Sequence, residues 1–155
     1  MDISCASLKT SAGTIYIQES EGTIIHIGFR DPNIREHMTP LLKEATDQLM
    51  EYFNGKRKDF DITFAVIGSE LQKDVCNSLM KIPYGETRTY KEIAKDVGRP
   101  KAIRAVATAI GKNPVSVVIP CHRVIGSDGN MRGFGGGIPF KEYLLGVEGW
   151  KPPKK

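Results

Sequence analysis

The strand-like segments of this chain all precede Ile67-Gly68, and the regular patterns after that dipeptide are helical. Segments 12–19 and 23–29 are rich in β-branched residues and are separated by a short polar turn, which predicts a β-hairpin. A third strand-like run covers residues 60–66. Strands confined to one part of a chain favour an α+β fold over alternating strand and helix units.

Helical spacing defines the remaining elements. Apolar residues recur at helical intervals over 39–55, with Pro40 at the first helical position, where its missing N–H is tolerated. Ser69 and Gln72 have the spacing of a reciprocal capping box, which predicts a helix over 69–81. We therefore expect two domains: a small amino-terminal α/β domain with a structural role, residues 1–68, and a mostly helical, winged-helix-like domain, residues 69–155.

A helix-turn-helix pattern follows in the second domain. Thr89 and Glu92 repeat the capping-box spacing at the start of one helix. Gly98 ends that helix and Pro100 opens the next. Two helices joined by a short turn with glycine are typical of the DNA-binding helix-turn-helix motif. The apolar face of the second helix is expected to comprise Ile103, Val106, Ala107 and Ile110.

The opposite face of that helix and the charge of the domain favour a polyanionic partner. That face carries Lys101, Arg104, Ala105 and Thr108. Small side chains let a helix approach a surface closely, and the two cations attract phosphates. Residues 69–155 hold 15 Lys/Arg and 8 Asp/Glu, a net of +7, whereas residues 1–68 hold 7 and 10, a net of −3. DNA binding by the second domain is therefore expected.

Cysteine content and hydropathy exclude several classes of protein. Three cysteines are too few for a disulfide framework and favour a reducing, intracellular setting. The longest apolar runs, 105–110 and 115–119, are far shorter than the roughly 20 residues of a membrane span, and no secretory signal is visible. We expect a monomeric cytoplasmic protein, associated with the nucleoid if the source is prokaryotic, that binds no membrane.

The strongest chemical signal lies around Cys121. Residues 115–119 are apolar enough to be buried, and Pro120 ends that run, so Cys121 emerges at a fixed position. His122 and Arg123 follow at once, and a neighbouring imidazole or cation lowers the pKa of a thiol toward its nucleophilic form. Cys121 is therefore the predicted nucleophile, although a lone cysteine is usually a small core residue.

The segment Pro120-Cys121-His122-Arg123-Val124 resembles the active-site signature of the O6-alkylguanine-DNA alkyltransferases, also called methylated-DNA–protein-cysteine methyltransferases. The resemblance covers about 69–149, and over 1–68 only the general layout agrees. It implies DNA repair by irreversible, stoichiometric transfer of an alkyl group from O6-alkylguanine in duplex DNA to Cys121, with the damaged nucleotide flipped out. The other matching segments are 84–86 followed by Tyr90, 102–106 with Arg104 in its middle, 113–114, 135–137, and 141–145 followed by Glu148.

The resemblance also implies the roles of single residues at the reacting centre. Glu148 orients and polarises His122, and His122 accepts the proton of the Cys121 thiol through a water molecule. Asn113 braces this loop by hydrogen bonding. Tyr90 donates to the base, and Lys141 favours that donation. The substrate pocket is expected to include Val124, Gly135, where some members carry serine, and Gly136.

DNA contacts follow from the same resemblance. In the family the helix-turn-helix enters the minor groove, and Arg104 matches the arginine that takes the space of the flipped nucleotide. Tyr90 matches a tyrosine that crowds the phosphate and so helps rotation. The remaining residues expected to contact DNA are Lys91, Arg99, Ala102 and Ser127.

No metal or other cofactor is expected. Some members of the family bind zinc in the amino-terminal domain, but here that domain offers only Cys5, His26 and His37 as soft ligands, fewer than the four that a structural zinc takes. His26 alternates with isoleucines in a predicted strand, and we interpret it as an ordinary strand residue. Cys5 and Cys76 are predicted to be buried thiols.

Two other classes of function compete with this interpretation. A Cys-His hydrolase or transferase that turns over would need an oxyanion hole, and it would leave the basic helix-turn-helix without a purpose. A DNA-binding regulator or damage sensor without chemistry would lack the reactive cysteine that Cys121 supplies. Incubation with DNA that bears O6-methylguanine separates the three classes.

Overall fold

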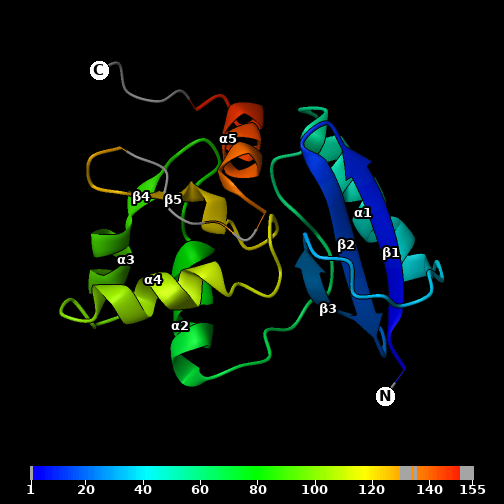
Figure 1. The fold of residues 1–155 in the computed structure, drawn as a ribbon, viewed down its shortest axis with the longest axis horizontal. Coiled ribbons are helices and arrows are strands. Elements are labelled where there is room, and N and C mark those ends of the chain that lie inside the picture. The colour runs from blue at the N-terminus through cyan, green and yellow to red at the C-terminus, as the bar shows by residue number, and fades with distance from the viewer. Residues whose placement is uncertain (1, 130–133, 135, 151–155) are drawn as a thin grey trace.

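The computed structural model describes residues 2–129, 134 and 136–150, and Figure 1 shows how its elements are arranged. The first half contains β1 (Ser4–Thr10), β2 (Gly13–Ser20), β3 (Thr23–Gly28) and α1 (Pro40–Phe53). The second half contains α2 (Glu70–Leu79), β4 (Arg88–Thr89), α3 (Tyr90–Asp96), α4 (Ile103–Gly111), the 3₁₀ helix η1 (Cys121–Arg123), β5 (Val124–Ile125) and α5 (Ile138–Val147). This arrangement confirms the predicted α+β fold.

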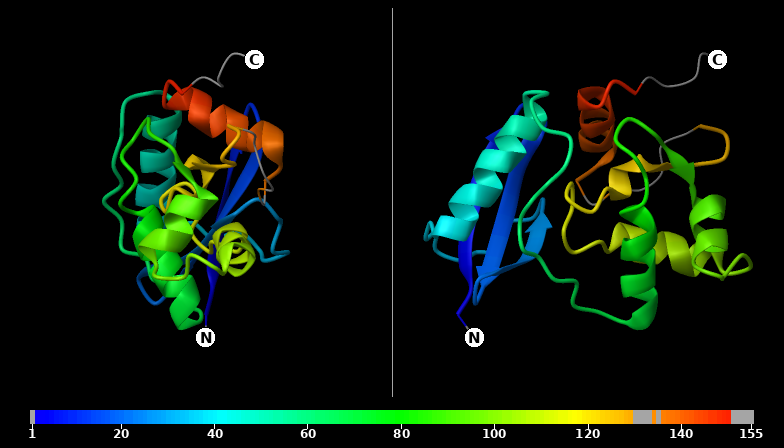
Figure 2. Two further views of the ribbon diagram at one scale, coloured as in Figure 1. Left: turned by 90° about the vertical axis from the view of Figure 1, so that its left-hand side faces the viewer. Right: turned by 180° about the vertical axis from the view of Figure 1, so that it is seen from behind.

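The three long strands form an antiparallel sheet in the order β1-β2-β3, and α1 lies across one of its faces (Figures 1 and 2). The predicted hairpin is present as β2–β3, and β1 is an additional strand that extends the sheet beyond it. Ile15 and Ile17 of β2 are fully buried and share a core with Leu49 of α1. Alternate strand residues point to one face, so this side of the sheet is the one that α1 covers.

The free edge of β3 joins the two halves of the chain. A β-bulge between Gln18 and Glu19 shifts the β2–β3 register, and Ile24 and Ile27, three residues apart, are both buried. Ile24 hydrogen-bonds with the chain that leaves α1, whereas the Ile27 N–H donates to the Pro114 carbonyl at 2.9 Å. The segment that precedes Cys121 is therefore fastened directly to the amino-terminal sheet.

The predicted strand over residues 60–66 is wrong. The segment is extended, and its side chains alternate between half-buried and exposed, but it makes only one isolated bridge, Ile24↔Phe64. Two hydrogen bonds surround that bridge, from Ile24 N to Thr63 O and from Ala65 N to Ile24 O. A longer ladder does not form because β3 is short and the rest of its edge pairs with the segment around Val115.

The capping predictions in the second half are met at one helix and only half met at the other. At α3 the box is complete, since Glu92 N donates to Thr89 Oγ1 at 3.1 Å and Thr89 N donates to Glu92 Oε1 at 2.9 Å. At α2 the Ser69 hydroxyl accepts from Gln72 N, but the Gln72 amide donates to Ala109 O on α4 at 2.9 Å. The side chain that would close the box instead ties α2 to α4.

The helix α4 begins at Ile103 and not at Pro100. The Ala102 N–H donates to the Arg99 carbonyl at 3.0 Å, so the residues around Pro100 form a turn and helical geometry starts only afterwards. Its buried face comprises Val106, Ala109 and Ile110; Ile103 is 38% exposed and Ala107 is half-buried, which corrects the predicted face. Within the described ranges, no helix has both the length and the apolar character that crossing a membrane requires.

Candidate active site

Cys121 sits at the end of a buried, internally braced segment. The Asn113 side chain donates to the Ile119 carbonyl at 2.7 Å and accepts from Val115 N at 3.0 Å. Val117 adopts a φ of +73°, a conformation that is strained for a β-branched residue. The hydrogen bonds of Asn113 and the conformation of Val117 fix the path of the chain before Cys121. Cys121 is the first residue of the 3₁₀ helix η1, and only 5% of its surface is exposed.

The Cys121 thiol is protonated at neutral pH. Burial raises the pKa of Cys121 to about 11, although the Asn113 side chain and the charge of Lys141 act in the opposite direction. The expectation that His122 and Arg123 lower this pKa is therefore corrected, because both side chains bind Glu148 instead. A thiol in this state needs a base that removes its proton during the reaction.

Glu148 is the centre of a buried hydrogen-bond network. Its Oε2 accepts from Tyr52 Oη at 2.5 Å, from His122 Nε2 at 2.7 Å and from Arg123 Nη2 at 3.0 Å. Its Oε1 accepts from Arg123 Nε at 2.8 Å and from the Gly85 N–H at 3.0 Å. Burial acts to raise the pKa of Glu148, but the hydrogen bonds outweigh it and hold the pKa at about 2, so the group is a carboxylate.

This carboxylate fixes the protonation state of His122. An ionised carboxylate can only accept, so His122 Nε2 carries the hydrogen and Nδ1 carries a lone pair. Burial lowers the pKa of His122 in spite of the neighbouring Glu148, which keeps the ring neutral. Among the described residues, His122 Nδ1 is buried and has no hydrogen-bond partner. The free lone pair is therefore available as a proton acceptor next to the thiol in sequence.

A second polar contact, which is partly buried, joins Lys141 to Tyr90. Lys141, on α5, is 1% exposed, and its ammonium donates to the Val124 carbonyl at 2.5 Å. The same nitrogen lies 3.5 Å from Tyr90 Oη and 5.7 Å from the centre of the Tyr90 ring. Tyr90 opens α3, so this contact brings a cation and a phenol together beside the helix-turn-helix.

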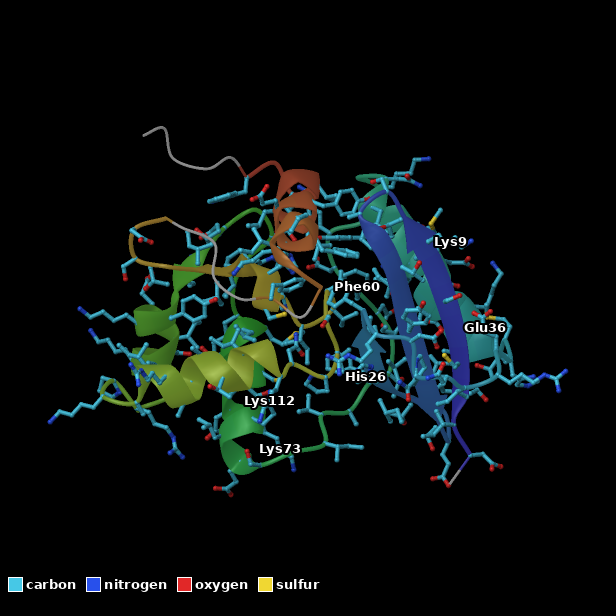
Figure 3. All side chains as sticks on the ribbon, viewed as in Figure 1. Lys9, His26, Glu36, Phe60, Lys73 and Lys112 are labelled. Carbon is cyan, nitrogen blue, oxygen red and sulfur yellow. The ribbon has the colours of Figure 1, made fainter. Side chains whose placement is uncertain are left out.

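A cavity of about 460 Å³ lies between the two halves and reaches Cys121. The second half lines it with Ile110, Lys112, Asn113 and Phe134, and the first half with Gln18, His26, Phe29 and Arg30. Figure 3 shows His26 projecting from β3 toward the end of α4. The contribution of the first half is not visible in the sequence, where His26 has the pattern of an ordinary strand residue.

The expected pocket residues lie in different places. Val124 is fully buried and holds Lys141 through its carbonyl; it does not line the cavity. Gly136 is also absent from the described lining, and a Cβ at this position would come within 2.8 Å of the Phe29 ring. Gly135 lies outside the described residues.

The residues expected to contact DNA lie on α3, in the turn between α3 and α4, on α4 and in the loop after β5. Lys91, Arg99, Arg104 and Ser127 are exposed, whereas Tyr90 and Ala102 are half-buried. Cys5 and Cys76 are buried free thiols, as predicted. Among the described residues there is no group of three or more His, Cys, Asp or Glu side chains arranged to hold a metal ion.

A buried cysteine followed by a neutral histidine that binds a carboxylate, together with a basic helix-turn-helix, is the arrangement expected of a DNA-binding protein whose chemistry uses a thiol. Two family models match the chain. The model of the ribonuclease-like domain of 6-O-methylguanine DNA methyltransferase matches residues 3–66, and the model of the DNA binding domain of the same protein matches residues 70–150. The chain therefore belongs to the O6-methylguanine-DNA methyltransferase family.

Individual relatives agree with this assignment. The chain is 53% identical over 148 residues to a methylated-DNA–protein-cysteine methyltransferase of Methanosarcina barkeri, which covers 91% of this chain and 94% of that protein. A crystal structure of the Mycobacterium tuberculosis O6-methylguanine methyltransferase matches with a TM-score of 0.86 at 34% identity, over 99% of this chain and 97% of that one. The M. tuberculosis protein in complex with DNA matches with a TM-score of 0.83 at 38% identity, over 93% and 91%.

The function follows from these relatives. This protein is an enzyme that binds DNA and repairs it by moving a methyl group from damaged DNA to a cysteine of the protein.

Proposed function

We propose that Cys121 is the cysteine that accepts the alkyl group and that the substrate is O6-alkylguanine in duplex DNA. The observation that carries this proposal is the neutral His122, whose Nδ1 lone pair is held free by the Glu148 carboxylate beside the protonated thiol. The other two cysteines are buried and have no such partner among the described residues.

The transfer is a displacement at carbon. The Cys121 proton passes to His122 Nδ1 through a bridging water, and Glu148 stabilises the imidazolium that forms. The sulfur then bonds to the alkyl carbon as the bond from that carbon to guanine O6 breaks, and the electron pair stays with the base. Because the product is a thioether, each protein molecule acts once and irreversibly.

The leaving guanine is stabilised by a second pair of residues, Tyr90 and Lys141, which are separate from the Cys121–His122 pair. Tyr90 Oη donates to the base as negative charge develops on the ring, and the Lys141 ammonium 3.5 Å away favours that donation. A buried cation is effective here because a low-dielectric surrounding strengthens its interaction with the developing charge. The base reaches this place by rotating out of the duplex.

The outer surface of α3 and α4 binds the DNA. Arg104 is exposed on α4, and its neighbour Ala105 is small enough for close approach to a narrow groove. Arg104 takes the space of the flipped nucleotide. Tyr90 crowds the phosphate to help the rotation, and the further contacts that we assign are Lys91, Arg99, Ala102 and Ser127.

The organisation of the chain fits this division of labour. We assign the structural domain to residues 1–68 and the DNA-binding and alkyl-transfer domain to residues 69–155. A single copy carries every residue of the proposed chemistry, so we infer a monomer. With chromosomal DNA as its substrate, we place the protein in the cytoplasm, at the nucleoid in a prokaryote.

A single incubation tests the proposal. With duplex DNA that bears one O6-methylguanine in excess over the protein, each protein molecule should gain the mass of one methyl group and no more, and peptide mapping should place that group on Cys121. Cys121→Ser should still bind the alkylated duplex and gain no mass. Multiple turnover would instead indicate a hydrolase or transferase, binding with no mass change would indicate a sensor, and methylation of Cys5 or Cys76 would move the nucleophile.

A further inference from the structure

The amino-terminal half supplies one side chain to the Glu148 network. Tyr52, on α1, is completely buried, and its hydroxyl donates to Glu148 Oε2 at 2.5 Å. The same hydroxyl lies 3.4 Å from His122 Nε2, so both groups meet at one carboxylate oxygen. Every other described partner of Glu148 comes from the second half of the chain.

Aromatic packing holds the Tyr52 ring in place. The ring meets Tyr84 edge-on with centroids 6.2 Å apart, and the rings of Phe53 and Phe60 lie at 5.5 and 5.4 Å. Burial and the adjacent Glu148 carboxylate raise the pKa of Tyr52 far above its ordinary value. The phenol therefore remains protonated, and its hydroxyl is a permanent donor in a fixed position.

A fixed donor on Glu148 Oε2 has two effects on His122. It holds the oxygen where the His122 Nε2–H must point, and this orients the imidazole and its free Nδ1. It also takes up part of the negative charge that would otherwise act on His122 alone. Less charge on that oxygen stabilises the imidazolium less, so the hydroxyl keeps the proton affinity of Nδ1 down.

We propose that Tyr52 is a positioning residue of the alkyl transfer, through which the amino-terminal domain sets the orientation and basicity of His122. The inference rests on the proposed role of His122 as the base. It gives the first domain a part in the chemistry, beyond the structural role assigned to it from the sequence.

The test compares the pH dependence of transfer in Tyr52→Phe and in a matched control. The measured quantity is the single-turnover rate constant for methyl transfer from duplex O6-methylguanine between about pH 5 and pH 9. Tyr52→Phe should slow transfer by about tenfold at neutral pH, because a hydrogen bond to a charged group is lost. It should also move the acid limb of the profile to higher pH, since His122 becomes easier to protonate.

The control is Tyr143→Phe on α5. Tyr143 packs against Phe53 and Phe140 in the same aromatic cluster, and none of the hydrogen bonds in the network involves its hydroxyl. Its profile should coincide with that of the unchanged protein. A Tyr52→Phe profile that also coincides, even with a lowered melting temperature, would mean that the Tyr52 hydroxyl is merely structural and would overturn the inference.

A double-mutant cycle asks whether Tyr52 acts through Glu148. In a Glu148→Gln background, Tyr52→Phe should change the rate less than twofold, since the carboxylate it modulates is gone. An undiminished tenfold loss in that background would also overturn the inference. If Tyr52→Phe does not fold, 3-fluorotyrosine at position 52 keeps the hydroxyl as a stronger donor and should move the acid limb to lower pH; an unmoved limb then counts against the inference.

These outcomes are separate from those of the proposed function. If the unchanged protein gains no methyl group on Cys121, the proposed function fails before any variant is compared. If it does gain one and the Tyr52 variants behave like the control, only the role of Tyr52 fails.

Discussion

Arg123 binds both oxygens of Glu148, with Nε 2.8 Å from Oε1 and Nη2 3.0 Å from Oε2. The two side chains are 9% and 0% exposed. Arg123 also donates from Nη1 to the Ile82 carbonyl at 2.7 Å and lies over the Tyr84 ring. A planar, two-point contact of this kind fixes the carboxylate, and the carboxylate in turn fixes His122. The positive charge of Arg123, two residues after Cys121, thus serves to position the base.

Arg123→Met should lower the free energy of unfolding by about 3–5 kcal/mol, because it leaves a buried carboxylate without its main partner. Urea denaturation measures the loss. Arg88→Met is the matched control, since Arg88 pairs with Glu86 at 3.3 Å where the two side chains are 35% and 54% exposed, and a pair that water reaches contributes at most about 1 kcal/mol. Similar small losses for both variants would show that the Arg123 contact adds no stability.

Stability at acid pH should depend on Glu148. Its pKa of about 2 in the folded protein lies below the ordinary value of 4.5. A group with a depressed folded pKa contributes stability above its unfolded pKa and loses it as the pH falls toward the folded value. We expect Glu148 to contribute about 3 kcal/mol that disappears between about pH 5 and pH 2. The free energy of unfolding of Glu148→Gln, measured by urea denaturation, should therefore fall less steeply with decreasing pH than that of the unchanged protein. Parallel plots of that free energy against pH would contradict this expectation.

The free Cys121 thiol should react slowly with small electrophiles at neutral pH. Because its pKa is about 11, the rate of Cys121 modification by iodoacetamide should still rise steeply with pH above about pH 9. Circular dichroism at each pH checks that the protein stays folded. Peptide mass spectrometry follows Cys121 separately from the other two thiols. A plateau reached near neutral pH would indicate a stabilised thiolate and would contradict the need for His122 as a base.

Arg104→Ala should weaken transfer from duplex DNA by about tenfold or more while leaving the reaction with a free O6-alkylguanine base within about twofold, because only the duplex requires base extrusion. Lys73→Ala is the control, since it removes the same charge from an exposed position on α2 outside the helix-turn-helix. An equal loss on both substrates would remove Arg104 from base extrusion.

The elements with local signals were the ones that could be predicted. The helix expected over 39–55 is observed as Pro40–Phe53, because its first turn is capped by Thr39 and these signals act within a few residues. β1 has few β-branched residues and is stabilised by its pairing with β2, which a local pattern cannot show. The segment 60–66 has the composition of a strand, but only a short part of the β3 edge is available to pair with it.

The same distinction applies to the site. Asn113, Cys121 and His122 lie in one short segment, so their grouping was visible in the sequence. Glu148 was found only through the family resemblance. Tyr52 lies 96 residues before Glu148, and although helical spacing from Leu49 places it on the buried side of α1, nothing in the sequence names the partner of its hydroxyl.

The shared edge of β3 limits how this protein can be shortened or recombined. A fragment that begins near Ser69 would lose the backbone partners of Pro114 and Ser116, which lie five to seven residues before the nucleophile. A grafted amino-terminal module would need a strand whose donors and acceptors match Ile27 in register, as well as a phenol opposite Glu148. The two halves are therefore poor candidates for independent exchange in protein engineering, although the family models divide between them.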